Sequence, residues 1–189
     1  MTDQPVRRSQ ATRDRILEAA RSLFATQGYE STTLRQIAAL AETNVALAIR
    51  YFESKESLFA LAADFNLRLP PLQELARARL GRLLVSHFLA IWEDDRAGRE
   101  LVALLRAASS HAAARARIHA IFHDQLLTAV RGMGYEAAEA DTRAGLVASQ
   151  MLGLATVRYV LELGTGTLSR DATVRIVGAT IQRYLVGPL

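Results

Sequence analysis

The chain has 189 residues, half of them hydrophobic, with a net charge of +4 and no cysteine. This composition excludes a disordered chain, and the lack of cysteine excludes disulfides and thiolate metal sites. The N-terminal segment lacks the apolar core of a signal peptide, and the densest apolar stretch, 83–92, is too short to cross a bilayer. We therefore expect a cytoplasmic protein whose charge permits an anionic partner without requiring one.

Apolar residues recur at helical spacing throughout the chain, and no stretch alternates as a strand would. The sequence therefore predicts an all-α fold. Residues 1–8 are expected to form a mobile arm, followed by a first helix over about 9–27. Gly28 suits the left-handed residue that closes such a helix. The expected buried stripe of this helix consists of Ile16, Leu17, Ala20, Leu23 and Phe24.

Residues 31–58 carry the signals of two short helices. Thr33 and Gln36 have the spacing of a capping box, in which each side chain satisfies a backbone amide at a helix start. Asn44 is a natural cap for the second helix. Helices of about two turns are not stable alone. Packed against a longer helix they form a helix-turn-helix unit, whose second helix enters the major groove of DNA.

A third helix is expected to start after Ser54 and to run to Leu69. Pro70-Pro71 would end it, because proline donates no backbone hydrogen bond and restricts the residue before it.

Two segments, TRDRILEAARSLFATQGYESTTLRQIA and RYFESKESLFALA, resemble the DNA-binding head of the TetR family of transcriptional regulators over about residues 12–63. The matching landmarks are Ile16-Leu17, Leu23-Phe24, Gly28-Tyr29, Thr32-Thr33, Ile37-Ala38, Phe52 and Ser54-Lys55-Glu56. The resemblance implies a head in residues 1–53, a linking helix in 54–70 and a helical body for ligand binding and dimerisation in 71–189. It implies a DNA-binding regulator without cofactor or enzymatic activity, in particular a ligand-responsive repressor that binds a palindromic operator.

The resemblance also assigns residues to DNA. Thr33 would hold a phosphate at a helix start. Arg35 would reach a base edge, and arginine reading guanine is the commonest specific contact. Tyr51 would anchor a phosphate, with packing in the core as the alternative. The full expected set is Thr33, Arg35, Asn44, Val45, Ala46, Arg50, Tyr51 and Lys55.

Three positions depart from the family pattern. Glu42 stands at a turn where the family usually has glycine, and a positive φ there would cost on the order of 1 kcal/mol. Thr43 replaces an aliphatic residue, and Ile49 replaces a frequent tyrosine. These departures affect the DNA contacts expected from positions 42–49.

Downstream, amphipathic helices are expected at 72–82, 83–93, 99–110, 112–131, 136–163 and about 169–185, with breaks at Gly132-Met133-Gly134 and Gly164-Thr165-Gly166. Small residues recur every four positions along the fifth of these helices, and the sixth has a broad apolar face. Both patterns suit the core of a monomer, but the resemblance implies a homodimer with a four-helix interface. The residues expected there are Gly145, Ser149, Gly153, Val174, Val177, Gly178 and Ile181.

A ligand pocket is expected among the helices of the body, for a small hydrophobic or anionic effector. Its expected residues are His87, Phe88, Trp92, Arg106, His119, Phe122 and His123, of which Arg106 suits an anion. The alternative is a metal-binding sensor or enzyme, because His119 and His123 share a helix face beside Asp124. The HExxH pattern of zinc hydrolases is absent.

Overall fold

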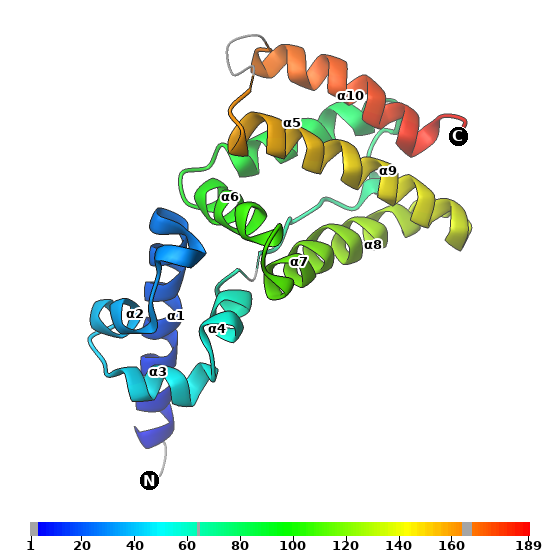
Figure 1. Ribbon diagram of the computed structural model, residues 1–189. Helices are drawn as coiled ribbons and strands as arrows, with labels where there is room; N and C mark the ends of the chain where they lie inside the picture. Colours follow the sequence, from blue (N-terminus) through cyan, green and yellow to red (C-terminus); the bar gives the residue numbers. More distant parts are fainter. Residues whose placement is uncertain (1–3, 64, 164–167) are drawn as a thin grey trace. The chain divides into compact units, whose positions relative to one another are not determined.

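The computed structural model describes residues 4–63, 65–163 and 168–189, with side chains from Ser9 onward. In these ranges the regular elements are all helical, which confirms the all-α fold (Figure 1). The chain forms two compact units, one from Met1–Asp64 with Arg99–Arg117 and the other from Phe65–Gly98 with Ile118–Leu189. The first unit therefore includes a later segment, 99–117, that the sequence had placed in the body.

Helix α1 spans Gln4–Ser31. The backbone is thus helical through most of the expected arm. Pro5 lies in the first turn, where the missing amide is tolerated, so nothing in the segment opposes a helix. Gly28 interrupts the helix with φ 79° and ψ 172°, a conformation open essentially to glycine alone. The positive φ at this position agrees with the sequence, although the chain continues for one more turn.

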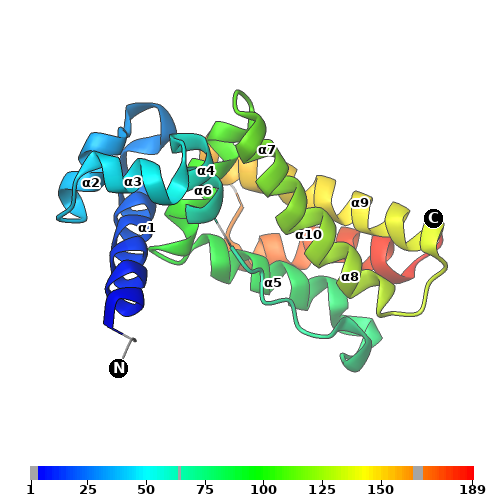
Figure 2. The same ribbon diagram turned by 90° about the horizontal axis from the view of Figure 1, so that it is seen from below.

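Helices α2 (Leu34–Leu40), α3 (Val45–Phe52) and α4 (Lys55–Ala62) begin at the three predicted caps. In each case the cap side chain accepts a hydrogen bond from a backbone amide in the first turn. The three helices pack around α1, as Figures 1 and 2 both show. Their shared core contains Ile16, Ala20, Phe24, Ile37, Ala48, Phe52, Leu58 and Phe59.

Helix α4 ends at Ala62 and not at Leu69 as expected. The following residues, Phe65–Leu69, have no regular secondary structure, and Arg68 among them has φ 48°; we call this segment the strap. Within the second unit, Gln125 Oε1 accepts from the Leu67 amide at 2.7 Å, and Gln125 Nε2 donates to the Phe65 carbonyl at 3.0 Å. These bonds replace those that a longer helix would have made.

The prediction of a helix over 72–82 is also wrong. Two 3₁₀ turns, Leu72–Glu74 and Arg77–Arg79, precede helix α5 at Leu80–Trp92. Gln182 holds this segment against helix α10 (Arg170–Val186). Its Nε2 donates to the Arg77 carbonyl at 2.6 Å, and its Oε1 accepts from the Gly81 amide at 2.8 Å.

The remaining helices are α6 (Ala97–Ala108), α7 (Ala112–His119), α8 (Gln125–Arg131), α9 (Ala137–Ala155) and α10 (Arg170–Val186). A π-helical turn, Ala120–Asp124, joins α7 to α8, and another, Thr156–Val160, extends α9. The predicted continuous helices over 112–131 and 136–163 therefore each contain a wide turn. The expected turn Gly164-Thr165-Gly166 lies outside the described residues. No helix in the described ranges is long and apolar enough to span a membrane.

Candidate nucleic-acid interface and ligand pocket

Helix α3 has one buried face and one exposed face. Ala48 and Phe52 are buried against the rest of the head. Ala46, Ile49 and Arg50 are exposed and share the opposite face, since they are three and four residues apart. This face combines small and apolar side chains with one guanidinium group. Such a surface can approach base edges closely, contact a thymine methyl group and donate to guanine.

The start of α3 is held by Asn44, whose Oδ1 accepts from the Leu47 amide at 2.8 Å. Asn44 is exposed and Val45 is half-buried. The side chain that caps the helix therefore also lies where the helix would first enter a groove.

Helix α2 begins with the predicted capping box. The Gln36 amide donates to Thr33 Oγ1 at 3.2 Å, and the Thr33 amide donates to Gln36 Oε1 at 2.8 Å. Thr33 and Arg35 are both exposed. A hydroxyl group and a guanidinium group thus lie at the solvent-facing start of this helix, and both can bind phosphate.

The turn between α2 and α3 contains Glu42 at φ 50°, so of the two possibilities at this departure from the family pattern, a strained turn or a different local geometry, the structure has the strained turn. The Glu42 amide donates to the Ala39 carbonyl at 3.1 Å, and the next amide, of Thr43, donates to the Ala38 carbonyl at 2.9 Å. The left-handed conformation is thus imposed by a hydrogen-bonded turn. This conformation has a steric cost for glutamate, which carries a Cβ atom, whereas glycine adopts it without that cost.

Tyr51 and Lys55 each have a partner within the head. The Tyr51 hydroxyl lies 3.0 Å from Ser9 Oγ of α1, and its side chain is half-buried. The Lys55 ammonium lies 4.2 Å from the centre of the Tyr29 ring and 3.5 Å from the Glu30 carbonyl oxygen. Both side chains are therefore held in defined orientations by the head itself.

Sequence reasoning did not identify the contacts that α1 makes with α3 beside this surface. Ser9 reaches Tyr51, and the guanidinium of Arg13 lies 5.3 Å from the centre of the Phe52 ring. Ser9 and Arg13 are four residues apart, so one face of α1 contacts α3 at both points. Helical spacing is the signal that could have identified this pair, since the helix expected over about 9–27 already includes both residues.

Tyr29 organises the other side of the head. Its hydroxyl donates to Glu56 Oε1 at 2.7 Å, and its ring lies 4.2 Å from that of His111, which follows α6. His111 Nε2 is also 2.6 Å from Glu30 Oε1. Burial raises the pKa of Tyr29, and the hydrogen bond from Tyr29 lowers the pKa of Glu56. These contacts attach the segment 99–117 to the head.

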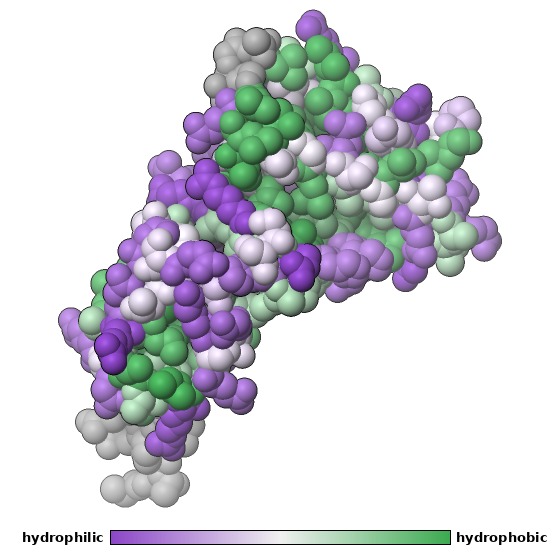
Figure 3. Space-filling view, in the orientation of Figure 1, coloured by the Kyte–Doolittle hydropathy of each residue, from purple (hydrophilic) through white to green (hydrophobic). Residues whose placement is uncertain are grey.

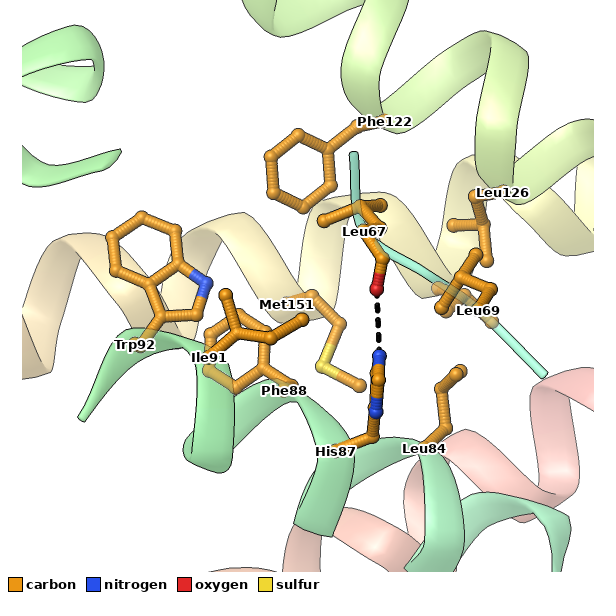
Figure 4. Close-up of a pocket in the computed structure, with 11 residues that line it drawn as sticks. Leu67, Leu69, Leu84, His87, Phe88, Ile91, Trp92, Phe122, Leu126 and Met151 are labelled. Carbon is orange, nitrogen blue, oxygen red and sulfur yellow. Dashed lines mark hydrogen bonds between the residues drawn. The ribbon is translucent and has the colours of Figure 1, made fainter. Parts of the chain in front are cut away.

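The second unit contains an apolar pocket with a cavity of about 30 Å³. It brings together four of the seven residues predicted for a ligand site, namely His87, Phe88, Trp92 and Phe122. The structure adds Leu67, Leu69, Leu84, Ile91, Leu126, Val147 and Met151. Figure 4 shows these side chains converging from α5, α9, the strap and the segment around Phe122. Helical apolar spacing was the signal for several of them, but Leu67 and Leu69 were expected on a helix of the linker.

The other three predicted pocket residues do not line this cavity. Arg106 is exposed on α6 of the first unit, and His119 and His123 are exposed at the π-helical turn. The two imidazole rings stack at 4.5 Å, and His123 Nδ1 lies 3.1 Å from Asp124 Oδ1. Nitrogen and oxygen atoms of His119, His123 and Asp124 all lie within 4.8 Å of one another. This is the cluster in the described residues that fits a metal, and it lies entirely at the surface.

The small residues of α9 form an exposed row. Gly145, Ser149 and Gly153 are exposed, and a Cβ atom on either glycine would have no neighbour within 4 Å. Beyond them, Val157, Leu161 and Leu163 are 44%, 55% and 60% exposed. Figure 3 shows hydrophobic surface over this end of α9.

Two of the four α10 residues predicted for the dimer interface are buried within the chain. Gly178 is buried and Ile181 is fully buried. A Cβ atom on Gly178 would stand 3.1 Å from atoms of Arg82 on α5. Both residues thus belong to the packing of α10 on α5 within one chain and are not accessible to a second chain. Val174 and Val177 are partly exposed and stay available.

Comparison with known protein families decides the identity. The family description "Tetracyclin repressor-like, C-terminal domain" matches residues 78–185, and "Bacterial regulatory proteins, tetR family" matches residues 16–62. The chain belongs to the TetR family. TetR-family proteins are DNA-binding transcriptional regulators and not enzymes.

Individual relatives agree with this assignment. The transcriptional repressor NicS of Pseudomonas putida is 36% identical over 107 residues, which are 53% of this chain and 43% of NicS. The match thus spans less than half the length of that relative. A TetR-family regulator from Streptomyces coelicolor is 26% identical with a TM-score of 0.57, and the match covers 93% of this chain and 95% of that one.

NalD of Pseudomonas aeruginosa, the secondary repressor of the MexAB-OprM multidrug efflux pump, has a TM-score of 0.65 at 21% identity. That match covers 94% of this chain and 97% of NalD. At this identity the likeness establishes the shared fold alone.

Proposed function

We propose that this TetR-family regulator is a ligand-responsive repressor that binds a palindromic operator as a homodimer in the cytoplasm. The observation that carries the proposal is the exposed face of α3, which presents Ala46, Ile49 and Arg50 on a buried base of Ala48 and Phe52. In the proposed complex this face enters the major groove. Thr33, Tyr51 and Lys55 bind phosphates on either side of it.

Dimerisation is the second element of the proposal. A palindrome is read by two heads related by a two-fold axis, with half-sites about 34–36 Å apart. The exposed row on α9, from Gly145 to Gly153, would let a second helix approach closely, because neither glycine carries a side chain there. Val174 and Val177 of α10 would add apolar area beside that row.

The ligand response is the third element. A cavity of about 30 Å³ has the volume of about one water molecule, whereas small-molecule pockets occupy about 300–1,000 Å³. An effector would therefore displace part of the wall. The strap forms one part of this wall, where the side chains of Gln125 and His87 make hydrogen bonds to its backbone, and it follows α4 in the chain. Displacement of the strap would act on α4 through the covalent chain and change the affinity of the head for DNA.

The DNA-binding element can be tested with a duplex selected from a random pool for binding to the wild-type dimer. The double variant Arg35→Ala with Arg50→Ala is expected to lose roughly 30-fold or more in affinity for this duplex at fixed salt, since two base contacts of about 1–3 kcal/mol each sum to at least about 2 kcal/mol. The double variant Arg99→Ala with Arg175→Ala removes the same charge from exposed sites elsewhere and serves as the control.

Fluorescence anisotropy at two salt concentrations separates base contacts from phosphate contacts. An equal loss on selected and random duplexes, with a shallower salt dependence, would assign both arginines to phosphates. Unchanged affinity for the selected duplex would refute the proposed DNA-binding surface.

A further inference from the structure

The indole N–H of Trp92 makes no hydrogen bond to the described part of the protein. The residue is 3% exposed, and its Nε1 is buried without a hydrogen-bond acceptor among the described residues. Buried indole N–H groups usually have such a partner, because an unmet buried donor is costly. An unsatisfied donor in the wall of a pocket therefore indicates what the pocket can bind.

The indole ring is held in a fixed orientation. Tyr159 stacks on it with ring centres 5.4 Å apart and planes 13° apart, and Phe88 packs against it at 5.5 Å. In Figure 4 the indole nitrogen is on the edge of the ring that points toward the other side chains of the pocket. Stacking thus fixes the plane of the indole, with its donor on the edge that points into the pocket.

Few other residues of the pocket lining could bind a polar group of a ligand. His87 Nε2 lies 2.7 Å from the Leu67 carbonyl oxygen, which can only accept, so this nitrogen donates to the strap. The other lining residues described are apolar, and none is Asp, Glu, Lys or Arg. An anion placed here would lose its hydration and would find no Lys or Arg among the lining residues to pair with.

We propose that the effector is an uncharged, mainly apolar molecule whose carbonyl or ether oxygen accepts a hydrogen bond from Trp92 Nε1. The aromatic rings of Phe88, Trp92 and Phe122 favour a flat, aromatic body. This assignment rests on the proposed function of the pocket as the effector site. It removes the anionic effector that Arg106 had suggested, because Arg106 is not part of the pocket.

Three probes of similar size test the chemistry on the full-length protein. Acetophenone has a carbonyl oxygen, α-methylstyrene replaces that oxygen with a methylene group, and benzoate carries a charge. Calorimetry is expected to give acetophenone a dissociation constant roughly 3- to 10-fold lower than that of α-methylstyrene, the range that one neutral hydrogen bond provides. Benzoate is expected to bind at least roughly 10-fold more weakly than acetophenone.

The chain contains a single tryptophan, so its indole N–H gives one resonance in a nitrogen–proton correlation spectrum. Acetophenone is expected to move this resonance downfield, and α-methylstyrene is not. Trp92→Phe retains an aromatic ring and removes the donor, so acetophenone should bind this variant no better than α-methylstyrene does. Circular dichroism verifies that the variant is folded, and the comparison of probes on the wild type does not depend on it.

Several outcomes would overturn the assignment. These are tightest binding by benzoate, equal binding of acetophenone and α-methylstyrene to the wild type, or no binding of either. The effect of bound acetophenone on DNA affinity is measured separately. Binding through Trp92 without any change in DNA affinity would refute the proposed effector role of the pocket and leave its chemistry intact.

Discussion

A Cβ atom on Gly81 of α5 would stand 2.1 Å from the carbonyl oxygen of Gly178 on α10. It would also stand 2.5 Å from the backbone nitrogen of Gln182. The two helices therefore cross with their backbones in direct contact, and the absence of a side chain at position 81 permits this approach.

Gly81→Ala is expected to lower the free energy of unfolding by about 3 kcal/mol or more, because backbone atoms of α10 would have to move. Urea denaturation measures the change. The matched control is Gly145→Ala, measured on the dissociated protomer because Gly145 belongs to the proposed dimer surface; it adds the same methyl group at a position where no atom beyond its own helical turn lies within 4 Å. The control is expected to gain about 0.5–1 kcal/mol from helix propensity. Equal effects of the two substitutions would contradict the close crossing.

Glu42→Gly is expected to stabilise the head. Glu42 has φ 50°, and glycine adopts this conformation without steric cost, although it also raises the entropy of the unfolded chain. The net gain should be about 0.5–1 kcal/mol, which corresponds to a rise in melting temperature of about 1–4 °C. Glu42→Ala is the control, since it removes the weak ion pair with Arg15 but keeps the side-chain Cβ. A gain in both variants would attribute the effect to charge and not to backbone conformation.

Glu56 makes the free energy of unfolding of the head depend on pH in the acidic range. The hydrogen bond from Tyr29 lowers the pKa of this carboxyl from its ordinary value of 4.5. A lowered pKa in the folded state means that the contribution is fully present above about pH 4.5 and is lost as the pH falls through the lower value. Glu56→Gln should therefore cost up to about 1 kcal/mol at neutral pH, a small value because the carboxylate is exposed.

The difference between Glu56→Gln and the wild type should disappear below the lowered pKa. Urea midpoints measured at neutral pH and at about pH 3, at constant ionic strength, test this. Glu53→Gln, another exposed carboxylate three residues away, controls for net charge. A loss that persists unchanged at low pH would show that the ionised carboxylate is not responsible.

Gly153→Leu tests the proposed dimer. The position is open within one chain, so the leucine should leave the protomer folded and obstruct only a second copy. Overpacking at such an interface should weaken dimerisation by roughly 10- to 100-fold, measured by sedimentation equilibrium. Ala116→Leu, at an exposed site of the first unit, is expected to leave the association unchanged. If the Gly153→Leu variant dimerises as tightly as the wild type, the interface lies elsewhere.

The parts of the fold that were predictable are those determined by neighbouring residues. The caps at Thr33, Asn44 and Ser54 involve partners within three positions, so the starts of α2, α3 and α4 were correct. The end of α4 was not, because Gln125 binds the strap from 58 and 60 residues away. Local propensity contains no information about such a partner.

In the candidate sites, too, features set by neighbouring residues were predictable and features set by distant residues were not. The exposure of Arg35 and Arg50 could be inferred from helical spacing on short amphipathic helices. Gly178 was placed at a dimer interface because a small residue at a helix crossing looks the same whether the second helix comes from the same chain or from another. Only the position of α5 distinguishes the two cases.

The inclusion of residues 99–117 in the first unit has a consequence for the modularity of this regulator. The backbone passes between the two units at 64–65, 98–99 and 117–118, so no single cut separates the DNA-binding part from the rest. A fragment ending at residue 70 would lose His111 and with it the partner of Glu30 and the aromatic neighbour of Tyr29. A chimera that exchanges DNA specificity between relatives must therefore transfer a second, internal segment together with the N-terminal helices.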